Sequence, residues 1–338
     1  MRQICQYLNG CKDDPFNRED GSFSTLWTSA RAATTRVRKN IPELQWAYTN
    51  SKNSFEIKIP AKNKTITIID ADSRKMLSST LRQSLQDYYS RKLQSKPDQG
   101  KTWESISRHP FSNHMMVNGR YSRFCDWKFI HRARLGVLPL NGCQRWTQGD
   151  RRCRRCGNEV ESTAHVLNNC LRNMKAITRR HNNIQDLLVT DGIKSLPCKE
   201  IRIGKTIPFQ QLSSQVIPQE LQQLKPDIVV INKAAKTIDI VDITIPFENS
   251  SKALENARQK KLDKYNPLAT PLPTWTVRVN AFVIGSLGSW LGSNYQVLKT
   301  LGLTNACSNT LARLACSTSI KWSRDIYVEH VSGSQQYQ

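Results

Sequence analysis

The sequence has no long apolar segment. The longest apolar stretch, Val279 to Leu291, is interrupted by glycine. It is too short to cross a bilayer, because a spanning helix takes about 20 apolar residues. The segment from Met1 to Asp20 also has no apolar core of the kind that secretory signals carry. We therefore expect a protein that does not act in or on a membrane.

Cysteine pairs are also scarce. Ten cysteines are spread over the 338 residues, and only two of them form a Cys-x-x-Cys pair. A small secreted domain held together by disulfides would be shorter and denser in cysteine. We expect reduced cysteines, in a nuclear or cytosolic protein.

Acidic side chains are few. The chain has 27 Asp and Glu against 50 Lys and Arg, which gives a net charge of +23. Such a charge repels itself in a compact fold, and it is typical of proteins that bind a polyanion, most often nucleic acid. The alternative is a basic protein whose charge serves solubility alone.

The length allows two or three domains of roughly 100–200 residues each. Region 1–99 is predicted as an accessory region, and residues 95–102 form a polar break after it. Its pattern predicts two amphipathic helices around a β-hairpin, at 22–39, 55–59, 65–69 and 73–95.

Region 100–150 is predicted as a basic, aromatic, helical linker. Phe124, Trp127 and Ile130 fall on one predicted helix face. The basic residues around them form either a solvated face or a surface that stacks on bases and contacts phosphates. They are Arg120, Arg123, Lys128, Arg132 and Arg134.

Region 151–190 carries four soft metal ligands, Cys153, Cys156, His165 and Cys170. Their spacing, Cys-x2-Cys-x8-His-x4-Cys, is typical of a closed, structural zinc knuckle followed by a helix. The alternative is a buried histidine among unrelated cysteines. We expect nearby arginines to contact phosphates, namely Arg151, Arg152, Arg154, Arg155, Arg179 and Arg180.

Region 199–330 places two carboxylates in apolar strands. Asp227 opens one strand, and Asp242 lies in the middle of the next. A short turn between them predicts a hairpin that brings both together. Ile238, Ile240 and Asp242 fall on one face, and Val241 and Ile243 on the other. Two adjacent buried carboxylates are best explained by a bound divalent cation, and oxygen ligands favour magnesium or manganese.

A basic helix at 250–265 follows, with Lys261 and Tyr265 on the side that faces the sheet. Carboxylates, a metal and a lysine suit phosphodiester hydrolysis. The alternative is two carboxylates in turns beside a solvent-facing helix. A strand at 275–284 and helices at 293–301 and 304–328 complete an α/β (α+β) fold with a mixed sheet. Residues 331–338 form a polar tail.

Together these motifs resemble a known arrangement. Pro226-Asp227, Asp242 and the Lys261–Tyr265 segment are similar to the restriction-like endonuclease domain of site-specific non-LTR retrotransposons, within the PD-(D/E)xK nuclease superfamily. The Cys-Cys-His-Cys motif followed by Arg180-His181-Asn182 resembles the zinc knuckle that precedes this domain. Residues 127–134 resemble the linker before the knuckle.

The resemblance implies a nuclease that nicks target DNA so that the exposed end primes reverse transcription. It implies that Asp227 and Asp242 hold the metal, that Lys261 is the catalytic lysine and that Tyr265 lies beside it. DNA and the element RNA are the implied partners. The alternative is a zinc-dependent DNA- or RNA-binding fragment without activity.

The sequence departs from the superfamily in two respects and from whole retrotransposon proteins in a third. Thr244 stands where the superfamily usually has its lysine, and Lys261 on the following helix is the expected substitute. The helix-borne glutamate of the superfamily has no clear counterpart, and Glu220 is the candidate. Polymerase motifs are missing, so we expect a C-terminal piece of a larger retrotransposon protein, or a truncated copy.

Overall fold

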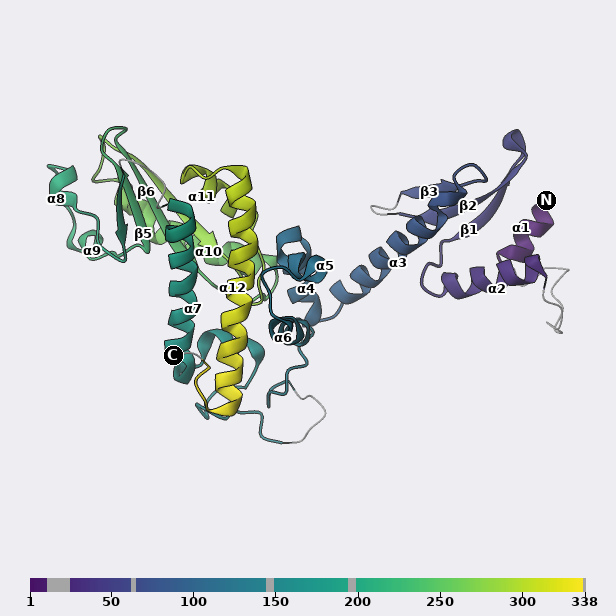
Figure 1. The fold of residues 1–338 in the computed structure, drawn as a ribbon, viewed down its shortest axis with the longest axis horizontal. Helices are drawn as coiled ribbons and strands as arrows, with labels where there is room; N and C mark the ends of the chain where they lie inside the picture. Colours follow the sequence, from purple (N-terminus) through teal and green to yellow (C-terminus); the bar gives the residue numbers. More distant parts are fainter. Residues whose placement is uncertain (11–24, 62–64, 144–148, 194–198, 337–338) are drawn as a thin grey trace. The chain divides into compact units, whose positions relative to one another are not determined.

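A computed structural model describes residues 1–10, 25–61, 65–143, 149–193 and 199–336. The chain forms two compact units, Met1–Ser95 and Lys96–Gln338 (Figure 1). Their boundary falls inside the predicted polar break, while the finer domain boundaries stay predictions. Among the described residues, no helix has the length and apolar character needed to cross a membrane.

The first unit is a three-stranded antiparallel sheet with helices. The strands follow the order β1-β2-β3, and Ile57 of β2 lies opposite Ile69 of β3. The predicted hairpin is therefore confirmed, whereas β1 was not predicted. Ile41, Leu44 and Ile59 form the buried core. The elements are α1 (Arg2–Leu8), α2 (Leu26–Arg38), β1 (Gln45–Thr49), β2 (Ser54–Pro60), β3 (Ile66–Ile69) and α3 (Leu77–Gln94).

The second unit combines helices with a four-stranded sheet. Its helices are α4 (Gln99–Ser107), α5 (His114–Asn118), α6 (Phe124–Arg134), the π-helix η5 (His165–Asn169), α7 (Met174–Leu187), α8 (Phe209–Leu212), α9 (Gln219–Gln222), α10 (Ser251–Tyr265), α11 (Asn294–Thr300) and α12 (Asn305–Ser332). Its strands are β4 (Glu200–Ile203), β5 (Ile228–Asn232), β6 (Thr237–Thr244) and β7 (Thr276–Val283).

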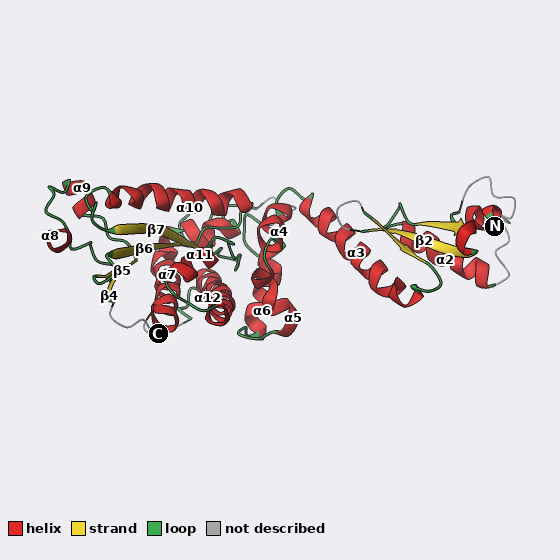
Figure 2. Cartoon of the chain, turned by 90° about the horizontal axis from the view of Figure 1, so that it is seen from above, coloured by secondary structure: helices red, strands yellow, loops and turns green. Residues whose placement is uncertain are grey.

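The sheet of the second unit is mixed, as the sequence predicts. Its order is β4-β5-β6-β7, and β6 runs antiparallel to β5 but parallel to β7. A parallel pair needs a crossover, which α10 provides. In Figure 2, α10 covers one face of the sheet, and α7, α11 and α12 lie on the other. Strand β6 is therefore covered on both faces and paired on both edges.

Alternation along β6 explains these two layers. Ile238 and Ile240 join the core cluster that includes Tyr265 of α10. Val241 and Ile243 join the opposite cluster, with residues of α7 and α12. Successive strand residues point to opposite faces, so one apolar run serves both layers.

A second core lies outside the sheet. Ile130 of α6, Leu167 of η5 and Ile320 of α12 pack in one buried cluster. The predicted linker, the cysteine segment and the last helix therefore share a core. In both Figure 1 and Figure 2, α7 and α12 lie side by side.

Buried charges connect these layers. Glu248, fully buried, accepts hydrogen bonds from the backbone N–H groups of Leu287 (2.8 and 2.9 Å) and Ser289 (3.1 Å). Arg134 donates to the Leu287 carbonyl at 2.8 Å from the other side. The loop after β7 is thus held by a carboxylate and a guanidinium together.

Two arginines that were expected to contact nucleic acid are buried instead. Arg134 is 7% exposed and Arg180 is 1% exposed. Arg180 donates to the hydroxyl of Ser323 at 2.8 Å and to the carbonyl of Leu167 at 3.0 Å. Burial lowers the pKa of each guanidinium to about 10, with the charge of Glu248 opposing this. The expectation is corrected: both side chains hold the fold together.

The role of Glu248 can be tested by stability. Glu248→Ala leaves buried N–H groups of the 285–289 loop without an acceptor, which costs about 1–3 kcal/mol for each such group. We expect a loss of roughly 3 kcal/mol or more in urea unfolding. Glu255→Ala removes a carboxylate with a half-exposed side chain on α10, and it should change stability by less than about 0.5 kcal/mol. Equal effects would contradict the assigned role.

Candidate active site and metal centre

The hairpin β5–β6 brings Asp227 and Asp242 together. Ile228 pairs with Val241, so continuing the antiparallel register by one step places Asp227 opposite Asp242. The backbone N–H of Ile243 donates to Asp227 Oδ2 at 2.6 Å. The two carboxylates predicted from sequence therefore lie at the same end of the sheet.

Lys261 reaches the buried carboxylate from α10. Asp242 is 2% exposed, and its Oδ2 lies 2.5 Å from Lys261 Nζ. The same oxygen accepts no hydrogen bond among the described residues apart from this ion contact. A buried carboxylate without a counter-charge would be strongly disfavoured. In the protein without metal, Lys261 supplies the positive charge that offsets Asp242.

Tyr265 lies one helical turn after Lys261 and is buried on the same side of α10. Its hydroxyl donates to the carbonyl of Lys225 at 3.3 Å. Burial raises the pKa of Tyr265, and the nearby charge of Asp242 raises it further. The phenol therefore stays protonated and can serve as a hydrogen-bond donor beside the carboxylates.

His181 joins this site, which the sequence did not reveal. Its Nε2 lies 3.1 Å from Asp227 Oδ2. Burial alone would lower the pKa of His181, but the hydrogen bond and charge of Asp227 outweigh it, and the net shift is upward. In the sequence, His181 is only the middle residue of the Arg180-His181-Asn182 segment. Its position directly after Arg180 in the segment that follows the cysteines was the available signal.

The carboxylate pair suits a hard divalent cation. Both donors are oxygens, and magnesium is usually held by one or two carboxylates, with water and substrate phosphates completing its shell. Among the described residues, no group of three possible ligand atoms within 4.8 Å of one another includes Asp227 or Asp242. The donors fit magnesium or manganese with several positions left for water. The glutamate considered from sequence, Glu220, is exposed on α9.

A further buried carboxylate in β6 was also missed. Asp239 is 2% exposed and forms two contacts with Arg278 of β7, at 2.5 and 2.8 Å. The two residues are register partners in the parallel ladder. A carboxylate paired in this bidentate way is explained by the fold, and it needs no metal.

The four soft ligands form a compact cluster. The ligand atoms of Cys153, Cys156, His165 and Cys170 all lie within 4.8 Å of one another. Cys156 Sγ is 3.3 Å from His165 Nε2, and the sulfurs of Cys153 and Cys170 are 3.9 Å apart. This cluster can hold a metal such as zinc.

The backbone prepares the cluster for a cation. Backbone N–H groups of Glu159 and Asn158 donate to the Cys156 sulfur and lower its pKa to about 6. Burial raises the pKa of Cys170 to about 11. Thiolates crowded in a buried site need a positive charge between them, which a bound metal supplies.

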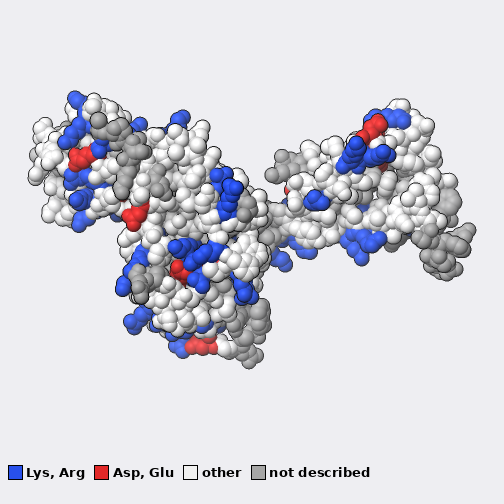
Figure 3. All heavy atoms as spheres, viewed as in Figure 1, with Lys and Arg blue, Asp and Glu red and all other residues white. Residues whose placement is uncertain are grey.

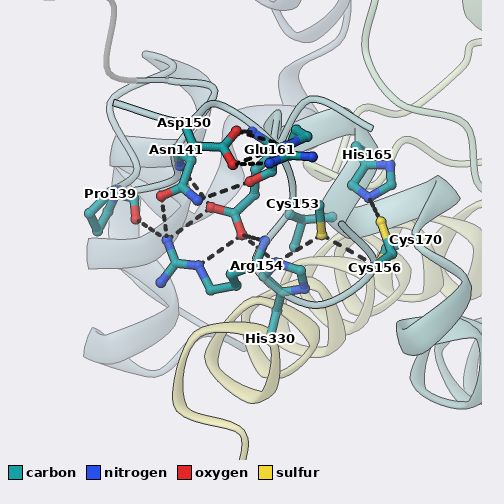
Figure 4. A network of polar contacts seen from close by, with 12 residues as sticks. Pro139, Asn141, Asp150, Cys153, Arg154, Cys156, Glu161, His165, Cys170 and His330 are labelled. Carbon is teal, nitrogen blue, oxygen red and sulfur yellow. Dashed lines mark hydrogen bonds and ion pairs between the residues drawn. The ribbon is translucent and has the colours of Figure 1, made fainter. Parts of the chain in front are cut away.

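Behind the cysteines lies a second polar layer (Figure 4). Glu161 is fully buried and contacts Arg154 Nε at 2.8 Å and His330 Nε2 at 2.9 Å. His330, near the end of α12, is also 3.7 Å from Cys153 Sγ. Burial raises the pKa of Glu161, but hydrogen bonds, first that of Arg154, outweigh it and lower the value to about 2. Glu161 thus links the cysteine segment to His330 of α12, while Arg154 holds the Glu161 carboxylate in place.

The other predicted nucleic-acid contacts differ in exposure. The exposed ones are Arg120, Arg123, Lys128, Arg132, Arg151, Arg152 and Arg154, while Arg155 and Arg179 are half-buried. In Figure 3, basic atoms appear in many places over both units, and acidic atoms in a few isolated ones. The surface on this side is compatible with a polyanion.

Two proteins of known name are similar to the chain. Both are described as retrovirus-related Pol polyproteins from the type-1 retrotransposable element R2 of Popillia japonica. One is 28% identical over 195 residues, covering 56% of this chain and 37% of the relative. The other is 22% identical over 249 residues, covering 68% and 52%. The chain thus spans about half or less of these relatives, and no family model matches it. The similarity supports a retrotransposon protein.

Metal content tests the cysteine cluster. A closed site with four such ligands should retain about one zinc ion per chain during purification. Cys153→Ser and Cys170→Ser should each lower this content. Cys307→Ser, which changes an exposed cysteine elsewhere on α12, should not. Unchanged zinc in both ligand variants would remove the cluster as the binding site.

The pair of His181 and Asp227 predicts a pH dependence. Because the pKa of folded His181 is raised above its ordinary 6.5, the pair stabilises the fold fully below pH 6.5, and this stabilisation is lost as pH rises through the raised value. The difference in unfolding free energy between the parent and His181→Gln should be largest below pH 6.5. A difference that grows with pH would contradict the pairing.

Proposed function

We propose that the chain is a metal-dependent DNA endonuclease with a PD-(D/E)xK-type core. The observation that carries the proposal is the convergence of Asp227, Asp242 and Lys261 at one end of the sheet, with Lys261 Nζ 2.5 Å from Asp242 Oδ2. Asp227 stands directly before β5, Asp242 lies in β6, and Lys261 joins the two carboxylates from α10.

The residues divide the chemistry between them. Asp227 and Asp242 offer the oxygen ligands, and the metal they would hold supplies polarisation of the scissile phosphate and a bound water of lowered pKa. Lys261 holds its ammonium group beside the carboxylates, where it can stabilise charge that develops on the phosphate. Tyr265 lies beside Lys261, and its hydroxyl donates a hydrogen bond to the Lys225 carbonyl.

His181 acts as a positioning residue in this proposal. It contacts the same Asp227 oxygen that accepts the N–H of Ile243, so it fixes the orientation of that carboxylate. A carboxylate held in one rotamer binds a metal at lower entropic cost. His181 comes from α7, on the face of the sheet opposite α10.

The similarity to R2 polyproteins gives the activity a context. We infer that the chain is a piece of a retrotransposon protein that nicks target DNA in the nucleus for target-primed reverse transcription. DNA and the element RNA would be its partners. The cysteine cluster would be a structural zinc knuckle that orients the basic surface next to the nuclease.

A second function has its own support. Asp242 forms an ion pair with Lys261, and Asp227 lies within hydrogen-bond distance of His181, so both carboxylates have protein partners without a metal. With a net charge of +23, the chain can instead be a nucleic-acid-binding piece without activity. That function predicts salt-sensitive binding without cleavage.

Neighbouring lysines on α10 separate the two functions. Lys261 contacts Asp242, whereas Lys260 is exposed beside it. Lys261→Ala should slow nicking of supercoiled DNA in magnesium by roughly 10²–10³-fold, the typical loss when one charge-stabilising group is removed. Lys260→Ala removes the same charge and should leave nicking nearly unchanged.

Asp242→Asn completes the test. If the parent nicks DNA and Asp242→Asn nicks equally fast, the assigned site is wrong. If the parent binds DNA but does not nick it in magnesium or manganese, the binding function is supported instead. Binding that ignores salt would count against both.

A further inference from the structure

Three aromatic rings form a stack on the outer face of α6. Phe124 and Trp127 have ring centroids 5.8 Å apart at 13°, and Trp127 and His131 have centroids 5.5 Å apart at 16°. The residues follow one another at intervals of three and four, which places them on one side of the helix. The rings are nearly parallel, so their faces point along the stack.

This stack is not part of the core. The sequence placed Phe124, Trp127 and Ile130 on one helix face, but only Ile130 is buried. Phe124 is 78% exposed and Trp127 is 38% exposed. The inner face of α6 is filled by Ile130, Phe129 and Ala133. Packing within the second unit therefore does not explain the exposed rings.

A hollow opens where the stack ends. Its volume is about 350 Å³, and Phe124, Trp127 and Arg123 line it together with Met115, Gly119 and Ser122. Arg123 is held by Asp126 at 2.7 Å, which fixes the start of α6 and the position of Phe124. The hollow is open to solvent, and a planar group that enters it can lie on the exposed ring of Phe124.

Positive charge accompanies the rings. Lys128 and Arg132 are both exposed on α6. Lys128 lies one helical turn after Phe124, and Arg132 directly follows His131 in the sequence. Neither side chain forms an ion pair with another described residue. Cations spaced along an aromatic stack match the alternating phosphates and bases of an unpaired strand, because bases stack on aromatic rings while basic groups follow the backbone.

We propose that the outer face of α6 is a base-stacking platform for single-stranded DNA, with Phe124 and Trp127 contacting bases and Lys128 and Arg132 contacting phosphates. The stacking does not depend on the nuclease, since it uses none of the residues near Asp242. The choice of DNA over RNA rests on the proposed function.

Fluorescence anisotropy with the full chain tests the platform. The probes are a labelled single-stranded DNA, the same sequence as RNA, and the blunt DNA duplex. Phe124→Ala and Trp127→Ala should each weaken binding of single-stranded DNA by about five- to 150-fold, the factor for a stacking contact of ~1–3 kcal/mol. Duplex binding should change much less. Trp127→Phe keeps a ring and should retain most of the affinity.

Two controls separate stacking from charge and from folding. Tyr89→Ala removes an aromatic side chain that is 53% exposed in the first unit, and it should leave binding unchanged. Lys128→Ala should lower the salt dependence for single strand and duplex alike, whereas the ring variants should keep it. Phe124 is largely exposed, so Phe124→Ala should unfold at the same temperature as the parent.

Several outcomes overturn the proposal. Equal losses on duplex and single strand would show that the rings support phosphate contacts only. Unchanged binding in both ring variants would show that the face is not used. A loss confined to RNA would overturn the choice of DNA. If the ring variants bind DNA as the parent does but form a smaller assembly in solution, the face would instead contact a second copy of the chain. Each of these leaves the nicking test of Lys261 unaffected.

Discussion

Burying a carboxylate inside a fully covered strand is the constraint around which the second unit is arranged. Asp242 lies in β6, which is paired on both edges, and only 2% of it is exposed. Water cannot offset its charge there, so a cation must come from the protein, either from the next strand, as Arg278 does for Asp239, or from a covering layer. Lys261 of α10 supplies it at 2.5 Å. That contact fixes which face of α10 meets the sheet, and therefore where Tyr265 lies.

The same requirement recurs away from the strands. Glu248 is buried with Arg134 and Arg180 close enough for their charges to act on it. A buried ion pair adds little net stability over an apolar one, but removing one partner is costly. In the 285–289 loop, the Glu248 carboxylate accepts the backbone N–H of Leu287, and the Arg134 guanidinium donates to the Leu287 carbonyl. They therefore fix how α6, α7 and α12 meet around that loop.

Sequence patterns predicted what depends on local period. Alternation in β6 assigned Ile240 and Val241 to opposite faces. The four-residue spacing of Lys261 and Tyr265 placed both on one side of α10. The cysteine spacing identified four ligand residues whose atoms lie within 4.8 Å of one another. Each prediction needs only the geometry of one element, or of elements joined by a short turn.

What failed depends on packing between distant segments. On α6, an apolar face built on Phe124 and Trp127 and one built on Phe129 and Ala133 are both compatible with helical spacing, and only the contact with α12 selects the second. Arg180 resembles any surface arginine until Ser323, far along the chain, accepts its hydrogen bond. His181 of α7 contacts Asp227, which precedes β5, only because the helix packs on the sheet. No local sequence pattern relates the two residues.

The charges at the candidate active site bear on how a metal would bind. Asp227 contacts His181 and Asp242 contacts Lys261, on opposite sides of the sheet. Asp227 and Asp242 would hold a divalent cation with the same oxygens that His181 and Lys261 contact, so the metal would compete with both side chains. Lys261, freed from part of its contact, would still be held next to the site by α10. In the proposed nuclease, its charge would then face the phosphate, so one lysine would stabilise the folded protein without metal and the proposed reaction with it.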